Sequence, residues 1–210
     1  EEGYPGNLDV SVVYTLTNNN ELMVKFSATS DMPTPVNLTK HNYWNLGGVG
    51  SGNILNHELT IVANQYLDVN NNLIPTGKLL EVKGTPLDFT TPKTVGEHIQ
   101  SIPKIEGLPQ GYDHCFVLPD ESKNLKFAAR VKDSVSGRSM EIYTTQPGIQ
   151  FYSGNFLDGK PESGGYKQYD GFCLETQHFP DSINHPQFPN TVLRPKQKYT
   201  QTTIHKFSTK

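Results

Sequence analysis

The residues of this sequence best suited to chemistry are a histidine in a polar and aromatic stretch and a glutamate that follows two apolar residues. His41 lies within residues 34–48, among Asn and Thr residues and shortly before Tyr43, Trp44 and a glycine pair. An imidazole has a pKa of about 6.5, so it gives up and regains a proton readily near neutral pH. The carboxylate of Glu175, with an ordinary pKa of about 4.3, is ionised at that pH and can accept a proton. Together these groups are suited to acid/base proton transfer on a small molecule.

Two further polar residues are candidates for binding hydroxyl groups. Asp113 follows a Gly-Tyr pair, and an ionised Asp offers two acceptor oxygens. Gln146 stands before Pro147, and its amide can both donate and accept. Each candidate also has a structural explanation: a hydrogen-bonding strand end for His41, a solvent-facing strand position for Glu175, a turn for Asp113 and packing at a strand end for Gln146.

The elements that must position these residues are β-strands, because alternation of apolar and polar residues recurs along the chain. Two pairs of alternating runs flank short turns and predict hairpins: residues 8–16 with 22–29, and residues 125–131 with 139–145. Further strands are predicted at 36–39, 57–63, 78–82, 115–118, 170–175 and 199–207, with a polar turn at 120–124 and one short helix at 92–102. We therefore expect an all-β fold, an antiparallel β-sandwich, formed by a single domain over residues 1–210.

The composition argues against two classes of partner. Lys and Arg number 18 and Asp and Glu number 21, so the formal charge of −3 leaves no basic excess for nucleic acid or an anionic membrane. No apolar run approaches the roughly 20 residues that span a bilayer. Cys115 and Cys173 lack metal-ligand spacing and are too few for a disulfide framework, so we expect two buried free thiols and a cytoplasmic protein.

Five stretches, taken in order, resemble the aldose 1-epimerases, also called galactose mutarotases. They are residues 34–48, 73–77 with 84–89, 111–114, 145–156 and 173–181. One such stretch is a weak signal, whereas five in the same order are specific, and they extend over essentially the whole chain. The resemblance implies the supersandwich fold of galactose mutarotases. The N-terminal part of the family pattern, which supplies an Arg and another His to the sugar pocket, has no counterpart here, so an N-terminally incomplete domain is expected.

The resemblance implies an isomerase that interconverts the α and β anomers of a free hexose such as galactose or glucose. It implies His41 as general acid and Glu175 as general base, with Asp113 and Gln146 binding sugar hydroxyls. Trp44 or another aromatic residue would stack on the sugar, although a lone Trp is more often part of a core. Neither a metal nor an organic cofactor is expected, and the protein should be a monomer or weak dimer.

Two alternative functions remain open on the sequence. A non-catalytic sugar-binding or sugar-sensing protein could use the same fold, because a fold does not determine function. A hexose 6-phosphate epimerase would need an Arg-rich pocket for the phosphate. The three arginines, Arg130, Arg138 and Arg194, lie outside the stretches that carry the resemblance.

Overall fold

A computed structural model describes residues 3–119 and 124–209, and these residues form an almost entirely β structure. The strands, in chain order, are β1 (Leu8–Leu16), β2 (Glu21–Ser30), β3 (Thr34–Pro35), β4 (Glu58–Ile61), β5 (Gln65–Val69), β6 (Pro75–Glu81), β7 (Lys93–Thr94), β8 (Asp113–Val117), β9 (Lys126–Lys132), β10 (Arg138–Thr144), β11 (Gly148–Tyr152), β12 (Cys173–Gln177), β13 (Val192–Leu193) and β14 (Tyr199–Thr209). The helical elements of the described ranges are the 3-10 turns η1 (Ile99–Ser101), η2 (Pro161–Ser163) and η3 (Ser182–Asn184). None of these turns has the length or hydropathy to span a membrane.

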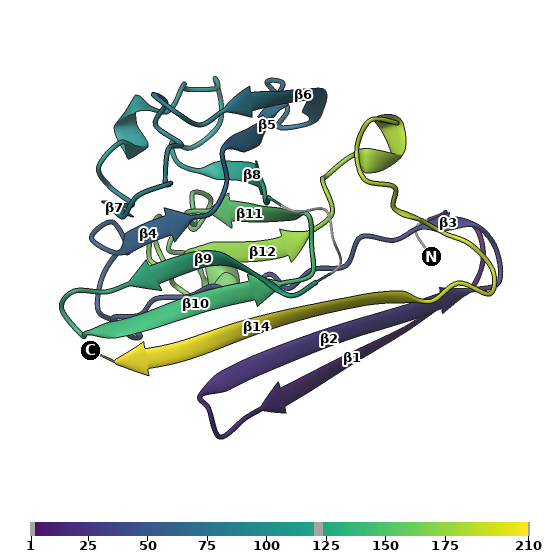
Figure 1. Cartoon of the computed structure of the whole chain (residues 1–210). Coiled ribbons are helices and arrows are strands. Elements are labelled where there is room, and N and C mark those ends of the chain that lie inside the picture. Colours follow the sequence, from purple (N-terminus) through teal and green to yellow (C-terminus); the bar gives the residue numbers. More distant parts are fainter. Residues whose placement is uncertain (1–2, 120–123, 210) are drawn as a thin grey trace.

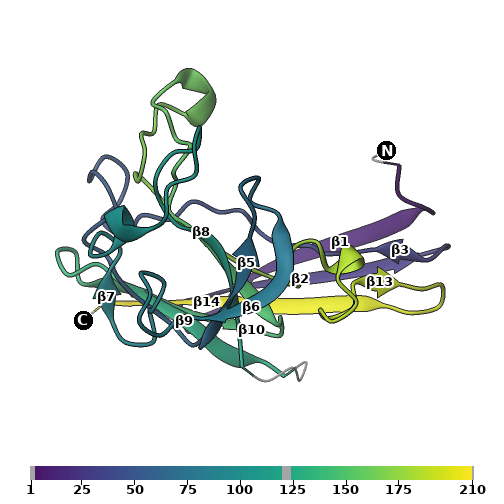
Figure 2. The ribbon, with the colours of Figure 1, turned by 90° about the horizontal axis from the view of Figure 1, so that it is seen from above.

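The strands form two large antiparallel sheets. The seven-stranded sheet has the order β1-β2-β14-β10-β9-β4-β7, the five-stranded sheet has the order β12-β11-β8-β5-β6, and β13 pairs with β3. Figure 1 shows β8, β11 and β12 above the β9–β10 part of the larger sheet, with β1 as its outermost strand. Seen from above, β1, β2 and β14 extend to one side, beyond β5 and β6 (Figure 2). All nine residues of β1 are exposed, which is typical of an unpartnered edge.

The main core lies between the two large sheets and is built by the inward-facing residues of alternating strands. From the larger sheet it receives Met140 and Ile142, and from the smaller sheet Phe116, Phe151 and Leu174, all of them buried. Alternation places every second side chain of a strand on this inner side. The other side of the five-stranded sheet carries polar residues of β8, β11 and β12 and a smaller apolar cluster around Leu67 and Cys115.

The predicted hairpins and most predicted strands are confirmed. β1 pairs with β2 from Leu8 to Leu16 without interruption, and β9 pairs with β10 with one irregularity. Both cysteines are free and buried, as expected. The predicted turn at 120–124 lies largely outside the described residues.

The predicted helix at residues 92–102 is wrong. The segment instead contains β7 and η1, although the side chains of Val95, Ile99 and Ile102 are buried as an amphipathic pattern requires. The backbone finds other partners, because the Val95 amide donates to the His57 carbonyl at 2.9 Å. Two β-branched residues and a glycine at 94–96 weaken the helix, so tertiary backbone pairing prevails.

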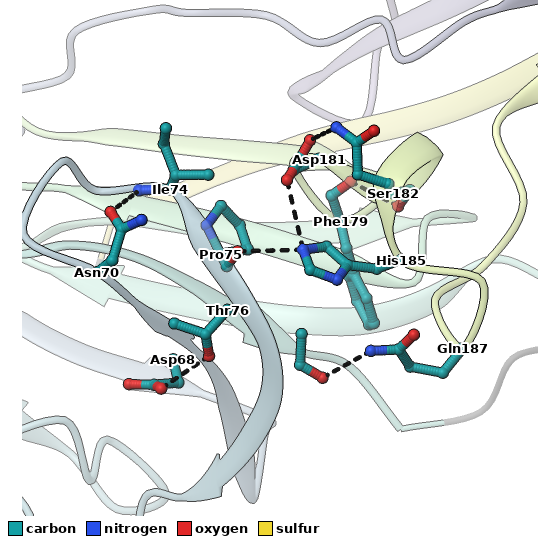
Figure 3. Close-up of polar contacts among 12 residues, drawn as sticks. Asp68, Asn70, Ile74, Pro75, Thr76, Phe179, Asp181, Ser182, His185 and Gln187 are labelled. Carbon is teal, nitrogen blue, oxygen red and sulfur yellow. Dashed lines mark hydrogen bonds and ion pairs between the residues drawn. The ribbon is translucent and has the colours of Figure 1, made fainter.

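The Pro-rich segment after β12 folds back over the β5–β6 hairpin. Figure 3 shows His185 between Asp181 and the Pro75 carbonyl: its Nε2 lies 3.1 Å from that oxygen and 3.3 Å from Asp181 Oδ2. Gln187 Nε2 donates to the Gly77 carbonyl at 3.0 Å. This packing covers Cys115 of β8 with two aromatic rings, Phe179 and Phe188.

Replacing Gly77 by Ala should destabilise the fold by about 2 kcal/mol, because two penalties combine. Gly77 has a φ of +86°, which favours glycine, and a Cβ there would lie 2.6 Å from Gln187 Nε2 and 2.7 Å from His185 Nδ1. Urea denaturation would measure the loss. Gly84→Ala is the matched control: its φ is +78° but an added Cβ meets nothing within 4 Å. It should cost only the backbone penalty, about 1 kcal/mol, and equal losses in both variants would show that the His185 contact is unimportant.

Candidate active site

Three neighbouring strands of the five-stranded sheet present polar side chains on one side. In the β12-β11-β8 register, Glu175 lies opposite Gln150, and Tyr152 lies opposite both Cys173 and Asp113. Directly opposed residues of antiparallel strands point to the same side of a sheet. These five residues, here called the polar face, therefore share the side turned away from the main core. The residues between them belong to the core: Ile149, Phe151 and Leu174.

An irregular segment after β3 carries His41 along the free edge of β12. Asn37 holds this segment through two hydrogen bonds with the backbone of His178, of 3.0 and 2.9 Å. Two residues further on, Thr39 Oγ1 donates to the Thr176 carbonyl at 3.0 Å. These anchors bring His41 beside the polar face.

The strand predicted at residues 36–39 is wrong, since regular pairing ends with β3 at Pro35. Side chains replace the backbone hydrogen bonds of a strand pair: the Thr39 hydroxyl binds the β12 backbone, and the Asn37 amide binds the backbone of His178, just after β12. Ser, Thr and Asn side chains commonly compete in this way with regular backbone pairing. The segment rejoins regular pairing at Trp44, which exchanges two backbone hydrogen bonds with Phe172.

His41 contacts two residues of the polar face at once. Its Nε2 lies 3.6 Å from Glu175 Oε1, and its Nδ1 lies 3.4 Å from Cys173 Sγ. The His41 side chain is 53% exposed, whereas that of Glu175 is 10% exposed. A solvent-accessible proton donor thus stands beside a buried carboxylate.

The electrostatics of the site follow from burial of two carboxylates near one imidazole. Burial raises the pKa of Glu175; His41 opposes this increase, and the nearby Asp113 adds to it. Burial likewise raises the pKa of Asp113, against a hydrogen bond of 2.7 Å that Gln150 Nε2 donates to its Oδ1. Both carboxylates are therefore stronger bases than they would be in water. The structure thus brings together three of the predicted site residues: His41, Asp113 and Glu175.

Tyr43 and Tyr152, rather than Trp44, form the aromatic wall beside His41. The His41 ring centroid lies 5.1 Å from that of Tyr43 and 5.9 Å from that of Tyr152. Trp44 turns the other way, against His205 at 5.4 Å. The contacts of Trp44 therefore support a role in core packing rather than stacking on a sugar.

Two cavities open beside the polar face. Asp113 lines one of about 280 Å³, and Tyr43 lines a wider cleft of about 1110 Å³. Phe156 lines both, and its amide donates to the Tyr152 hydroxyl at 2.8 Å. Small molecules therefore have space on either side of the site.

Gln146 lies apart from the other three predicted residues. It is 2% exposed, and its Oε1 lies 2.7 Å from Nδ1 of His178. It also interacts with Tyr199, and its backbone amide donates to Thr144 Oγ1 at 3.1 Å. These contacts favour packing at a strand end, and its binding to a ligand stays a prediction.

Gln150, Tyr152 and Cys173 are site residues that the sequence reasoning did not select. The period-2 rule contained the signal, because Cys173 stands two positions before Glu175 on a predicted strand. Gln150 and Tyr152 have the same spacing on β11. To place these residues beside Glu175 one must also know the β11–β12 register, which the sequence pattern alone does not give.

Comparison with protein families and curated proteins gives a consistent match. The family model described as aldose 1-epimerase matches residues 1–206. Galactose mutarotase of Rattus norvegicus is 53% identical over 211 residues, which cover 99% of this chain and 60% of that protein. The chain thus spans about three fifths of the length of the curated relatives it matches.

Two solved structures resemble the fold closely. An aldose epimerase homologue from C. elegans superposes with a TM-score of 0.85 at 30% identity, covering 99% of this chain and 62% of that one. Galactose 1-epimerase from Lactobacillus acidophilus superposes with a TM-score of 0.84 at 30% identity, covering 98% and 58%. These matches confirm the predicted resemblance and the antiparallel sandwich.

Proposed function

Because the chain belongs to the aldose 1-epimerase family, we propose that it interconverts the α and β anomers of a free hexose such as galactose or glucose. The observation that carries this proposal is the 3.6 Å separation of His41 Nε2 from Glu175 Oε1, beside Asp113. The anomeric hydroxyl and the ring oxygen of a sugar are bonded to the same carbon. An acid and a base that serve these two oxygens must therefore lie close together.

The reaction requires two proton transfers. Glu175 accepts the proton of the anomeric hydroxyl while His41 donates a proton to the ring oxygen, and the bond between that oxygen and C1 breaks. Rotation about the C1–C2 bond of the resulting aldehyde turns the other side of the carbonyl towards the ring oxygen. Ring closure returns both protons, so the enzyme ends in its starting state.

Asp113 and Gln150 of the polar face, and Tyr43 beside it, have positioning roles in this proposal. Asp113, held by Gln150, accepts hydrogen bonds from sugar hydroxyls. Tyr43, at 47% exposure, offers its ring to a C–H face of the sugar. Neither role needs a metal or an organic cofactor. We also assign the protein to the cytoplasm, since both of its thiols are free.

Polarimetry of freshly dissolved α-galactose tests the proposal. The protein should accelerate the decay of optical rotation above the spontaneous rate. Calorimetric binding of galactose without acceleration would instead identify a sugar-binding or sugar-sensing protein. A faster reaction with hexose 6-phosphate than with the free hexose would favour the phosphate alternative.

Replacing His41 by Asn should lower kcat by about 10²-fold, the low end of general acid catalysis, because water can reach the exposed position in place of the ring. Added imidazole should restore part of the rate. His98→Asn is the control, since His98 is a partly exposed histidine paired with Glu97, away from the site. A His41→Asn variant with the kcat of the parent protein would remove His41 from the mechanism.

A further inference from the structure

The polar face and His41 together offer three different metal-binding groups at one point. The ring nitrogen of His41, the thiol of Cys173 and the carboxylate of Glu175 supply ligand atoms that all lie within 4.8 Å of one another. Imidazole, thiolate and carboxylate are the ligand types of Zn²⁺ sites in proteins. A thiolate among them favours zinc and cadmium over magnesium and calcium.

Each of the two contacts of the His41 ring has about the length of a ligand–ligand edge in a tetrahedral zinc site, although the two contacts use different ring nitrogens. With Zn–N about 2.0 Å and Zn–S about 2.3 Å, adjacent ligand atoms of a tetrahedron lie about 3.5 Å apart. The His41 Nδ1 to Cys173 Sγ contact is 3.4 Å, and the His41 Nε2 to Glu175 Oε1 contact is 3.6 Å. The imidazole binds an ion through one nitrogen only, and the side chain of His41 is 53% exposed, so the proposal requires a small turn of the ring that lets one nitrogen share the ion with Cys173 and Glu175.

The backbone holds these three ligands in place. Cys173 and Glu175 point to one side of β12, which is paired with β11 along its whole length. The segment that carries His41 is anchored to the backbone of β12 by Thr39 and to that of His178, just after β12, by Asn37. Three protein ligands leave the fourth position of the ion open to water or to an incoming molecule.

We propose that His41, Cys173 and Glu175 form a binding site for Zn²⁺ and similar thiophilic divalent cations, and that the bound ion blocks sugar conversion. On binding, the thiol of Cys173 loses its proton to solvent, and the ion is held by thiolate, imidazole and carboxylate. The ion then occupies both groups that transfer protons, so it competes with the sugar. Inhibition rests on the proposed function, whereas binding of the ion does not.

Cadmium is the direct probe, because a cadmium–thiolate bond produces an ultraviolet charge-transfer band. Titration of the full chain with CdCl₂ should give a band that saturates at one ion per chain. Cys173→Ser should abolish the band. Cys115→Ser should keep it, because Cys115 is an equally buried free thiol of the same sheet that is not part of the three-ligand group. Absence of the band in the parent protein, or its persistence in Cys173→Ser, would overturn the proposal.

A second variant tests the site without altering the sheet. His41→Ala changes an exposed side chain and should weaken cadmium binding by more than about tenfold. Loss of a residue that merely supports a metal ligand already costs about that much, and His41 is proposed as a ligand itself. Unchanged affinity would refute the role of His41. Zinc should also slow mutarotation, with recovery on adding a chelator, and rates insensitive to zinc would refute the inhibition. A cadmium band in a protein without mutarotase activity would leave the metal site standing while the proposed function falls.

Discussion

Replacing Glu175 by Gln should lower kcat for anomer interconversion by about 10³-fold or more, within the range for loss of a general base. The amide preserves the size of the side chain and its place opposite Gln150, but it cannot take a proton from the anomeric hydroxyl. The carboxylate is 10% exposed, so water has little access to replace it. The expected loss is therefore larger than that for the exposed His41. Polarimetry at saturating sugar would measure it.

Two further variants separate catalysis from binding. Glu81→Gln is the matched control, because Glu81 is an exposed strand glutamate that accepts a hydrogen bond from Gln65; its kcat should not change. Asp113→Asn should raise KM more than it lowers kcat, since Asp113 binds hydroxyls in the proposed mechanism. If Asp113→Asn abolished kcat while Glu175→Gln retained it, the base would be Asp113.

The free energy of unfolding should fall steeply as the pH is lowered from about 6.5 to about 4. Burial lowers the pKa of His114 and of His205 to about 4 in the folded protein. In the unfolded chain a histidine has a pKa of about 6.5. Above that value both residues are neutral in both states, so stability is complete; below it the unfolded chain binds protons that the folded chain does not. Each histidine therefore contributes a loss on the order of 3 kcal/mol by pH 4.

The surroundings of these two histidines explain why their neutral forms are favoured. His114 Nδ1 accepts a hydrogen bond of 3.1 Å from the Asp113 amide, which a protonated ring could not do. His205 lies against Trp44, and the charge of Lys40 also opposes its protonation, whereas a hydrogen bond to the Leu22 backbone favours it. Burial is the largest cause for both residues.

Urea denaturation at several pH values measures this effect, and the slope counts the protons taken up on unfolding. His205→Gln should reduce that slope by about one proton in the same pH range. Equal stability at pH 7 and pH 5 would contradict the prediction.

Much of this fold was predictable because local alternation decides it. Residues 8–29 and 126–144 alternate on both sides of a turn, and both form hairpins. Residues 92–102 show the limit of such patterns: the buried positions were those of a helix, but backbone hydrogen bonds to residues 55 and 57 decided the conformation. A periodic pattern predicts which side chains are buried more reliably than it predicts whether the backbone is a helix or a strand.

The candidate site was harder to assemble from sequence. His41 and Cys173 are 132 residues apart, and they meet where Asn37 and Thr39 bind the backbone of His178 and of β12. No local rule predicts that an irregular segment will follow a strand edge through side-chain hydrogen bonds. The resemblance to a family supplied His41 and Glu175, whereas their contact and the place of Gln146 had to come from the structure.

The pairing of Glu175 with Gln150 fixes on which side of the sheet the Glu175 carboxylate lies. Residues 153–172 connect β11 to β12, and changes in their number leave the direction of the carboxylate untouched as long as the two strands keep their pairing. Inside β12, an insertion of one residue just before Glu175 would turn its carboxylate into the apolar interior and bring the next residue, Thr176, outward, whereas an insertion of two residues would restore the alternation. Insertions and deletions of any length are therefore tolerated in the connection, whereas those inside β12 must contain an even number of residues.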